Sequence, residues 1–417
     1  MAQTEAQVAA LELERVLPKI ETVFDMDDLF YATIKRRPAE KISNRQMRIP
    51  LELRSGGSFG YFNPDGGDLG RGGGPTYDKA VLSCVFLSEN IEYTKLNQWS
   101  TDDARKAIVN SVRRLTAGAI MELRRQLDGQ LSSGSGDGVV GTISAVATAA
   151  GIDTYDLDSD GFGARLVRAG QTIQVFDTTK VTLRGSGVIN TVDVENKEIT
   201  VEPAIAGAIA TDVLVVNGID TPSVPGEALL GVAYHDSNAS TGTWLGFDRA
   251  TTPEIRSNRV DGGGSALSLP LPRLGINKIG NRVGINNNFN PTAWMHPAQK
   301  QAYEDIGQGV IMIQKQPKAE SLNMYFDGMQ MAGANVKCSF NWKNSRIDFI
   351  DDGVWGRAEI LPIGFYTSDG RKIFEIRGAS GGVATAEIFY MVVGTQYFVN
   401  NPAATAYIDD LLVPTGY

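Results

Sequence analysis

A regular apolar stripe runs along residues 100–131, STDDARKAIVNSVRRLTAGAIMELRRQLDGQL. Its apolar residues recur at spacings of three and four, which is the period of one face of an α-helix. Ser100 can cap this helix, and Asp102 and Asp103 suit the positive end of its dipole. At about 1.5 Å per residue the helix would span roughly 45 Å. Its predicted core-facing residues are Ile108, Val112, Leu115, Leu123 and Leu127. Its arginines, Arg125 among them, are predicted to keep the remaining face in water.

A different period marks the segment before this helix. Residues 46–54, QMRIPLELR, alternate between apolar and mostly polar positions, which predicts a half-buried strand, and Pro50 favours an edge position. A second strand-like run covers residues 80–93. The glycine-rich stretch between the runs predicts the tip of an extended hairpin that projects from the body. We expect side chains near this tip to dock on another surface, and the candidates are Tyr61, Phe62, Leu69 and Arg71.

The first 45 residues carry only weak patterns. Residues 4–16 have a modest helical pattern that Pro18 ends, and the basic run of residues 35–37 with Pro38 breaks the next apolar stretch. Such a segment can bury little surface by itself. Two interpretations stay open: an arm that lies on another surface, or a frayed terminus.

Residues 164–227 change to short strand patterns separated by turns, which predicts a small all-β barrel or sandwich inserted into the chain. Removal of residues 170–221 is then expected to leave the remaining fold intact. The flanking sequence returns to mixed helix and strand patterns, and residues 321–417 are mostly strand-like. The predicted fold class is α+β.

Composition narrows the function classes. The 417 residues are enough for more than one compact unit. Cys84 and Cys338 belong to no spaced cluster, so the sequence predicts thiols of a reducing compartment and neither a disulfide nor a metal framework. The net charge of −9 disfavours tight nucleic-acid binding, which needs a basic surface. No apolar run approaches a membrane span, and the N-terminus lacks a signal-peptide pattern, so we expect a cytoplasmic, unprocessed chain.

Catalytic chemistry finds little support in the sequence. His235 is followed by Asp236, and His296 lies at a predicted helix start, but adjacency in sequence does not make a catalytic triad. Residues 136–141, GDGVVG, match a dinucleotide fingerprint without the strand that should precede it. Residues 156–161, DLDSDG, begin like a calcium loop, but position twelve is Val167 where a glutamate is needed. We therefore predict no catalytic residue, no cofactor and no metal.

The order of these elements resembles the major capsid protein of tailed bacteriophages, whose Hong Kong 97-type fold is shared with herpesvirus shells and encapsulins. The resemblance covers nearly the whole chain. It rests on the helix of residues 100–131 and on three further stretches: RIPLELRSGGSFGYFNPDGGDLGRGGG, SGSGDGVVG and TAWMHPAQKQAYEDI. None of these stretches is a strict motif, so what makes the resemblance specific is the order in which they follow one another.

The resemblance implies a domain for each segment. Residues 1–45 would be an N-terminal arm along neighbouring subunits, and residues 46–97 an extended loop (E-loop) across the next subunit. Residues 98–131 and 321–417 would form a peripheral domain containing the spine helix. Residues 132–163 and 228–320 would form an axial domain around fivefold and sixfold axes. Residues 164–227 would be a β-barrel-like insertion domain.

The resemblance also implies a function. It is that of a structural protein that self-assembles into pentamers and hexamers, forming an icosahedral virion head around double-stranded DNA without sequence-specific binding or membrane contact. Assembly would take place in the bacterial cytoplasm, with scaffold, portal and decoration proteins as further candidate partners. Some relatives cross-link a lysine to an asparagine, but neither Lys79 nor Lys95 has an identifiable partner. Two alternatives are an encapsulin-type compartment shell and a soluble hydrolase with an appended β domain. The hydrolase would require His235 or the acidic turns to converge in a pocket.

Overall fold

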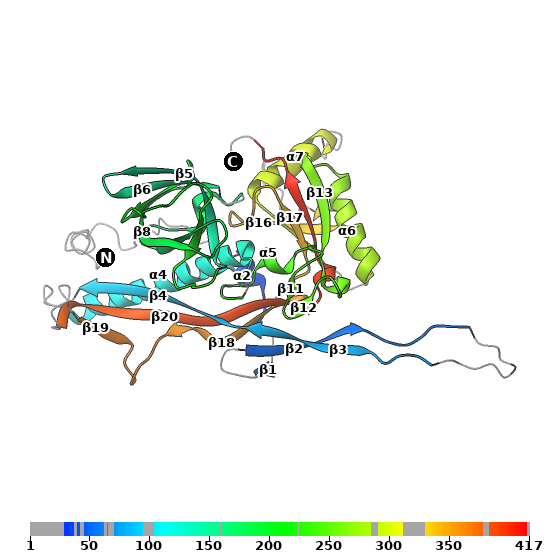
Figure 1. Cartoon of the computed structure of the whole chain (residues 1–417), viewed down its shortest axis with the longest axis horizontal. Helices are drawn as coiled ribbons and strands as arrows, with labels where there is room; N and C mark the ends of the chain where they lie inside the picture. The colour runs from blue at the N-terminus through cyan, green and yellow to red at the C-terminus, as the bar shows by residue number, and fades with distance from the viewer. Residues whose placement is uncertain are drawn as a thin grey trace, which may run out of the picture.

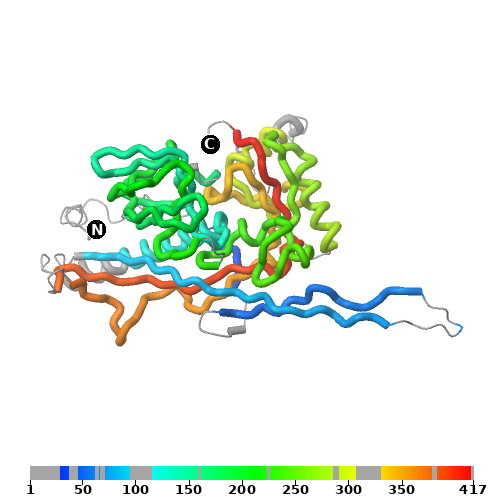
Figure 2. The backbone as a smooth tube through the Cα atoms, in the orientation of Figure 1, coloured from blue at the N-terminus to red at the C-terminus, as the bar shows by residue number. Residues whose placement is uncertain are grey.

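The computed structural model describes residues 29–36, 40–41, 46–61, 65, 71–94, 104–158, 161–222, 226–284, 291–311, 330–377 and 383–414. Helices and mostly antiparallel sheets combine in an elongated molecule, which confirms the α+β class (Figure 1). A long sheet layer lies along the base, a barrel and a second sheet stand side by side on it, and a hairpin projects beyond one end (Figures 1 and 2).

The base layer is a four-stranded antiparallel sheet whose central strand is β20 (Val383–Val399). Its partners are β18 (Trp355–Phe365), β19 (Ile373–Arg377) and β4 (Val85–Thr94). Alternate β20 residues such as Phe389, Met391 and Val393 are buried in one core cluster with the long helix. The intervening residues therefore point to the opposite face of the sheet.

The long helix is α4 (Ala104–Ser133), as the apolar stripe predicts. Leu123 and Leu127 are buried in the core and Leu115 packs against it, as expected. The side chains of Ile108 and Val112 lie outside the described residues, so their core role stays a prediction. The expectation for Arg125 is wrong. Its guanidinium is buried because it pairs with Glu122 at 3.2 Å and donates to the carbonyl oxygen of Arg165 at 3.1 Å.

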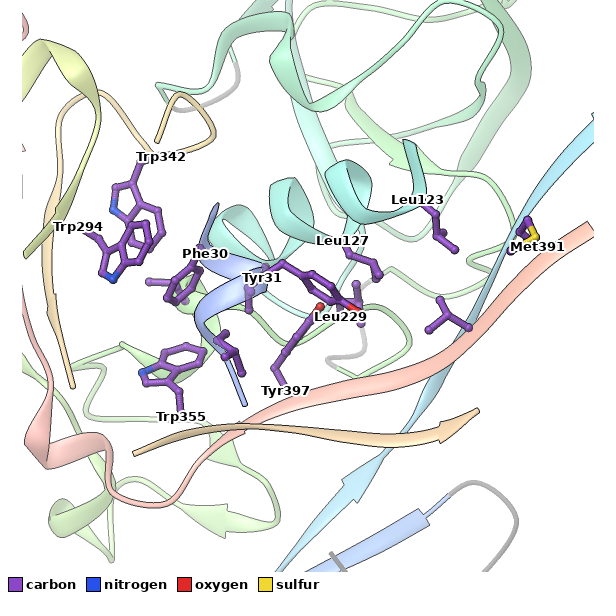
Figure 3. Packing of buried hydrophobic residues seen from close by; sticks show 14 of the residues in the cluster. Phe30, Tyr31, Leu123, Leu127, Leu229, Trp294, Trp342, Trp355, Met391 and Tyr397 are labelled. Atoms are coloured by element: carbon purple, nitrogen blue, oxygen red, sulfur yellow. The ribbon is translucent and has the colours of Figure 1, made fainter. Parts of the chain in front are cut away.

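The described part of the predicted N-terminal arm is integral to the subunit core. Residues 1–28 lie outside the described part, but the short helix α2 (Leu29–Thr33) packs against α4. Phe30 is fully buried among three tryptophans, with ring centroids 4.8 Å from Trp294, 5.0 Å from Trp342 and 5.7 Å from Trp355 (Figure 3). For residues 29–36 the expectation of a detached segment is therefore wrong, because three tryptophans distant in sequence form a pocket for Phe30.

A six-stranded closed barrel stands above one end of the base layer (Figure 1). Its strands, in sequence order, are β5 (Val139–Ala149), β6 (Ile152–Asp158), β7 (Thr172–Phe176), β8 (Leu183–Asp193), β9 (Glu198–Glu202) and β10 (Val213–Val216). The predicted boundary at residue 164 is wrong, because β5 and β6 close the barrel by pairing with β10 and β9. The 3₁₀ turn η1 (Gly163–Leu166) follows β6.

The other upper unit is a six-stranded mixed sheet, with strands in the spatial order β13-β21-β17-β14-β16-β15. Their bounds are β13 (Asn258–Ser265), β14 (Thr292–Met295), β15 (Gln330–Met331), β16 (Ala334–Cys338), β17 (Ile347–Ile350) and β21 (Ala406–Leu411). The predicted boundary at residue 321 is wrong, since residues 330–350 and 406–411 complete the same sheet as residues 258–295. Pairing between segments this far apart leaves no periodic signal in the sequence.

Two helices, α6 (Pro270–Val283) and α7 (Pro297–Ile311), pack on one face of this sheet. Its other face contributes Trp294 and Ile350 to the core that contains α2 and α4. The remaining short elements join the layers: α5 (Val232–His235), β11 (Thr243–Trp244), β12 (Phe247–Asp248), η2 (Pro253–Ile255) and η3 (Pro402–Ala404).

Candidate assembly surfaces

The projecting hairpin is formed by β2 (Gln46–Arg54) and β3 (Thr76–Ser83), with a short third strand, β1 (Glu40–Lys41), paired to β2. Its base is anchored in the subunit. Met47 and Ile49 are buried together with Leu82, Trp244 and Phe398 in one apolar cluster. The strict alternation in the sequence is thus explained, because one face of the hairpin base packs on the body and the other meets solvent.

The outer half of the hairpin leaves the body and buries none of its described residues (Figure 2). Its two branches stay close, because the N–H of Gly57 donates to the carbonyl oxygen of Gly73 at 2.7 Å. Gly56 has a φ of +70°, and a Cβ atom there would lie 2.4 Å from the carbonyl carbon of Gly74. Glycine is therefore required at position 56, where the two branches of the hairpin come closest.

The hairpin tip exposes aromatic rings. The side chain of Tyr61 is 98% exposed and that of Phe59 93% exposed, with their ring centroids 5.9 Å apart. Arg71 is exposed as well, whereas Phe62 and Leu69 lie outside the described residues. The sequence analysis missed Phe59, although its spacing of two from Tyr61 in an extended segment would have placed both on one side. Two exposed rings on a projection form a surface suited to a partner.

A second aromatic surface lies on the base sheet, on the face turned away from α4. Tyr366, Phe374 and Tyr390 form a cluster there, with ring centroids 5.9 to 6.4 Å apart. Tyr390 points outward because its neighbours Phe389 and Met391 are buried on the α4 side. The sequence analysis missed this surface, since its rings come from three strands that only the sheet brings together.

The same outer face is covered differently along its length. Near the end of β20, Phe398 packs under the base of the hairpin. Farther along the sheet, Phe86 is 53% exposed and lies over Gly394, where a Cβ atom would meet its ring at 2.7 Å. The hairpin base of this chain thus covers one part of the face, whereas in the aromatic part Tyr366 is exposed and Phe374 and Tyr390 are half-buried.

A groove of about 620 Å³ opens beside the hairpin base. The residues that line it include Leu51, Leu53, Trp244, Ile255, Val283 and Pro402. Charged groups border it: Arg54 pairs with Glu254 at 3.0 Å, and Arg282 donates to the carbonyl oxygen of Pro253 at 2.6 Å. The groove is therefore a mixed apolar and charged surface beside the projecting element.

The two histidines are structural in their geometry. His235 is buried, with Nδ1 accepting from the indole N–H of Trp244 at 3.0 Å and Nε2 donating to the carbonyl oxygen of Tyr397 at 3.0 Å. Burial lowers its pKa to about 3. His296 is also buried, 3.1 Å from the backbone nitrogen of Ala298, and burial and the nearby Arg165 lower its pKa to about 4. With both ring nitrogens engaged, His235 cannot serve an external substrate.

Within the described residues, no three histidine, cysteine, aspartate or glutamate side chains gather closely enough to hold a metal ion. Asp156 and Asp158, where the calcium-like pattern starts, belong to strand β6. Likewise, Val139 to Gly141 of the dinucleotide-like stretch belong to β5. Among the described helices, none is long and apolar enough to cross a membrane.

Comparison with known proteins rests on the fold. No protein-family model and no curated protein sequence matches the chain. The capsid protein of cyanophage A-1(L) superposes with a TM-score of 0.59 at 12% identity, covering 98% of this chain and 99% of that chain.

Two further structures superpose over nearly the whole length with lower scores. The capsid of the native GTA particle gives a TM-score of 0.48 at 11% identity, covering 99% of this chain and 100% of that chain. The SrpI encapsulin of Synechococcus elongatus PCC 7942 gives 0.44 at 10% identity, covering 100% and 98%. The superposition on the cyanophage protein carries the assignment: this chain has the fold of the major capsid proteins of tailed bacteriophages.

Proposed function

We propose that this chain is the structural major capsid protein of a tailed bacteriophage. In this proposal it assembles into pentamers and hexamers that close into an icosahedral head around double-stranded DNA. The observation that carries the proposal is the projecting hairpin, which belongs to a capsid fold and exposes Phe59 and Tyr61 almost completely. Exposed rings on an element that its own chain does not cover gain stability when another copy covers them.

The contact between copies follows from the two aromatic surfaces. In the proposal, the hairpin tip of one subunit lies on the outer face of the next subunit's base sheet, where Tyr366, Phe374 and Tyr390 gather. The two surfaces lie on different parts of the chain, so the contact is head-to-tail. Head-to-tail contacts close into rings when the rotation between subunits permits it, which agrees with pentamers and hexamers.

The domain roles belong to the same proposal. The base sheet with α4 would be the peripheral domain, and the six-stranded sheet with α6 and α7 the axial domain around the symmetry axes. The barrel would be an insertion domain. The net charge of −9 is compatible with a container that does not bind its DNA tightly. Scaffold, portal and decoration proteins remain candidate partners.

The hydrolase alternative is disfavoured because His235 is buried and both of its nitrogens are engaged inside the fold. An encapsulin-type shell remains a possible outcome of the test. The test is electron microscopy of the purified full chain, with light scattering to measure particle mass. Closed shells or rings of five and six subunits are expected, and DNA that resists nuclease inside shells from infected cells would separate a virion head from a compartment. A protein that stays monomeric even with scaffold and portal proteins co-expressed would overturn the proposal.

A further inference from the structure

The small helix α2 lies between two units of the fold, the six-stranded sheet and the base sheet, and packs in the core cluster that both share. Trp294 and Trp342 belong to the six-stranded sheet unit and stack on each other, with centroids 5.6 Å apart and planes 22° apart. Trp355 begins β18 in the base sheet. Among the ring pairs of the described residues, Phe30 connects Trp355 to the stacked pair (Figure 3).

The polar contacts of α2 repeat this bridging arrangement. Asp128 of α4 accepts from the backbone N–H of Tyr31 at 2.8 Å and from the side-chain amide of Asn341 at 2.9 Å. Asn341 lies between β16 and β17 of the six-stranded sheet. On the other side, the N–H of Arg357 in β18 donates to the carbonyl oxygen of Lys35 at 3.1 Å. Residues 29–36 therefore contact both units and the spine helix.

Three polar groups in the pocket that receives α2 have no hydrogen-bond partner among the described residues. The indole nitrogens of Trp294 and Trp355 and the hydroxyl of Tyr397 are buried without a hydrogen-bond partner in the described part of the chain. Tyr397 lies beside Tyr31 in this pocket (Figure 3).

Helix α2 itself cannot persist away from the pocket. It has five residues, and isolated helices of that length do not form in water because nucleation is unfavourable. Its order depends on burying Phe30, Tyr31 and Ile34, against the conformational entropy of fixing the segment. Residues 29–36 therefore fold only as they dock, with apolar burial favouring the docked state and conformational entropy opposing it.

We propose that residues 29–36 form a reversible latch that fixes the six-stranded sheet unit relative to the base sheet. With the latch docked, Phe30 fills the tryptophan pocket and the two units hold one orientation. With it undocked, the two units lose this joint and their relative orientation varies. This inference concerns the single subunit and does not depend on shell formation.

Hydrogen exchange in the full chain tests reversibility without any mutation. We expect the amides of Tyr31, Ile34 and Arg357 to exchange by a local opening, at least tenfold faster than the amide of Leu127 in α4. Equal protection of these four amides would overturn the proposal, because α2 would then open only when the whole subunit unfolds.

A distance measurement tests the effect on orientation. Spin labels are attached at Asn277 on α6 and Thr367 after β18, both exposed, in a chain with Cys338→Ser. We expect Phe30→Ala to broaden the interlabel distance distribution at least twofold and, because the lost ring is fully buried, to lower the global unfolding midpoint as well. The matched control is Phe389→Ala, which removes an equally buried ring that contacts Tyr93 and Phe365. It should lower the midpoint without broadening the distances.

Two results of this second experiment would overturn the latch. One is an unchanged distance distribution in Phe30→Ala, which would show that α2 does not set the orientation. The other is an equal broadening in Phe389→Ala, which would make the wider distances a general effect of losing a buried core ring. If Phe30→Ala fails to fold, the exchange measurement on the unmodified chain decides the question alone.

Discussion

The backbone N–H of Tyr31 donates a hydrogen bond to Oδ1 of Asp128 at 2.8 Å, although the two residues lie 97 positions apart. Asp128 is fully buried near the C-terminal end of α4, where an unpaired carboxylate would be costly. By accepting from the first turn of α2, it satisfies an N–H group that the short helix cannot pair internally. One carboxylate thus acts as a cap supplied by another helix.

Asp128→Ala should destabilise the subunit by about 3 kcal/mol, because the buried donors of Tyr31 and Asn341 lose their acceptor. Chemical denaturation followed by tryptophan fluorescence measures this change. Asp128→Asn keeps one acceptor oxygen and should cost less. If Asp128→Ala and the exposed control Asp220→Ala were equally stable, Asp128 would not have the capping role assigned to it.

The barrel should be removable as a unit. Its ends lie together, because the N–H of Gly226 donates to the carbonyl oxygen of Gly136 at 2.9 Å. Replacing residues 137–225 by a short glycine–serine linker should leave the other units folded, as circular dichroism and thermal unfolding would show. Deleting only residues 170–221 should cause misfolding, since β5 and β6 would lose their partners. If the variant lacking residues 170–221 folded and the variant lacking residues 137–225 did not, the barrel boundary assigned here would be wrong.

The aromatic tip should matter for assembly and not for folding. Phe59→Ser combined with Tyr61→Ser should change the free energy of unfolding by no more than about 0.5 kcal/mol, since both rings are exposed. The yield of shells in sedimentation should fall at least tenfold. Val181→Ser is the matched control, because Val181 is 72% exposed on the barrel, far from the hairpin in sequence. This variant should assemble normally. Normal shells from the double variant would remove the docking role of the tip.

Stability should fall as the pH rises because of Asp236. Burial, with the neighbouring Asp348, raises the pKa of Asp236 from 3.8 to about 8, and Arg346 opposes this shift. Thr405 donates to its Oδ1 at 2.7 Å. In this range the folded chain holds a proton that the unfolded chain has released, so its contribution is complete below about pH 4 and lost as the pH approaches 8.

Asp236→Asn should remove this dependence, since an amide does not titrate. Each pKa unit corresponds to about 1.4 kcal/mol. Between pH 5 and pH 8 the free energy of unfolding of the unmodified chain should therefore fall by a few kcal/mol more than that of Asp236→Asn. Denaturation midpoints at several pH values measure it. Parallel pH profiles for the two chains would show that Asp236 is already ionised in the fold.

Local periodicity was sufficient for several elements. The alternation of residues 46–54 predicted β2 with its bounds, because one face of the hairpin base is buried and the other is not. The three-and-four spacing predicted α4 and the buried positions Leu123 and Leu127. Tyr61 is exposed at the tip, and its docking role stays a prediction.

Long-range pairing decided the rest. The burial of Phe30 depends on three tryptophans at positions 294, 342 and 355, and the burial of Arg125 on a carbonyl oxygen of residue 165, so nothing near residues 30 or 125 in sequence could reveal either. The same holds for the barrel, which recruits β5 and β6, and for the aromatic face of Tyr366, Phe374 and Tyr390. The sequence by itself determined which segments are helices and strands, through their hydrophobic period. Only the tertiary structure decided which of them share a sheet, a pocket or a surface, because these contacts join residues that are distant in the chain.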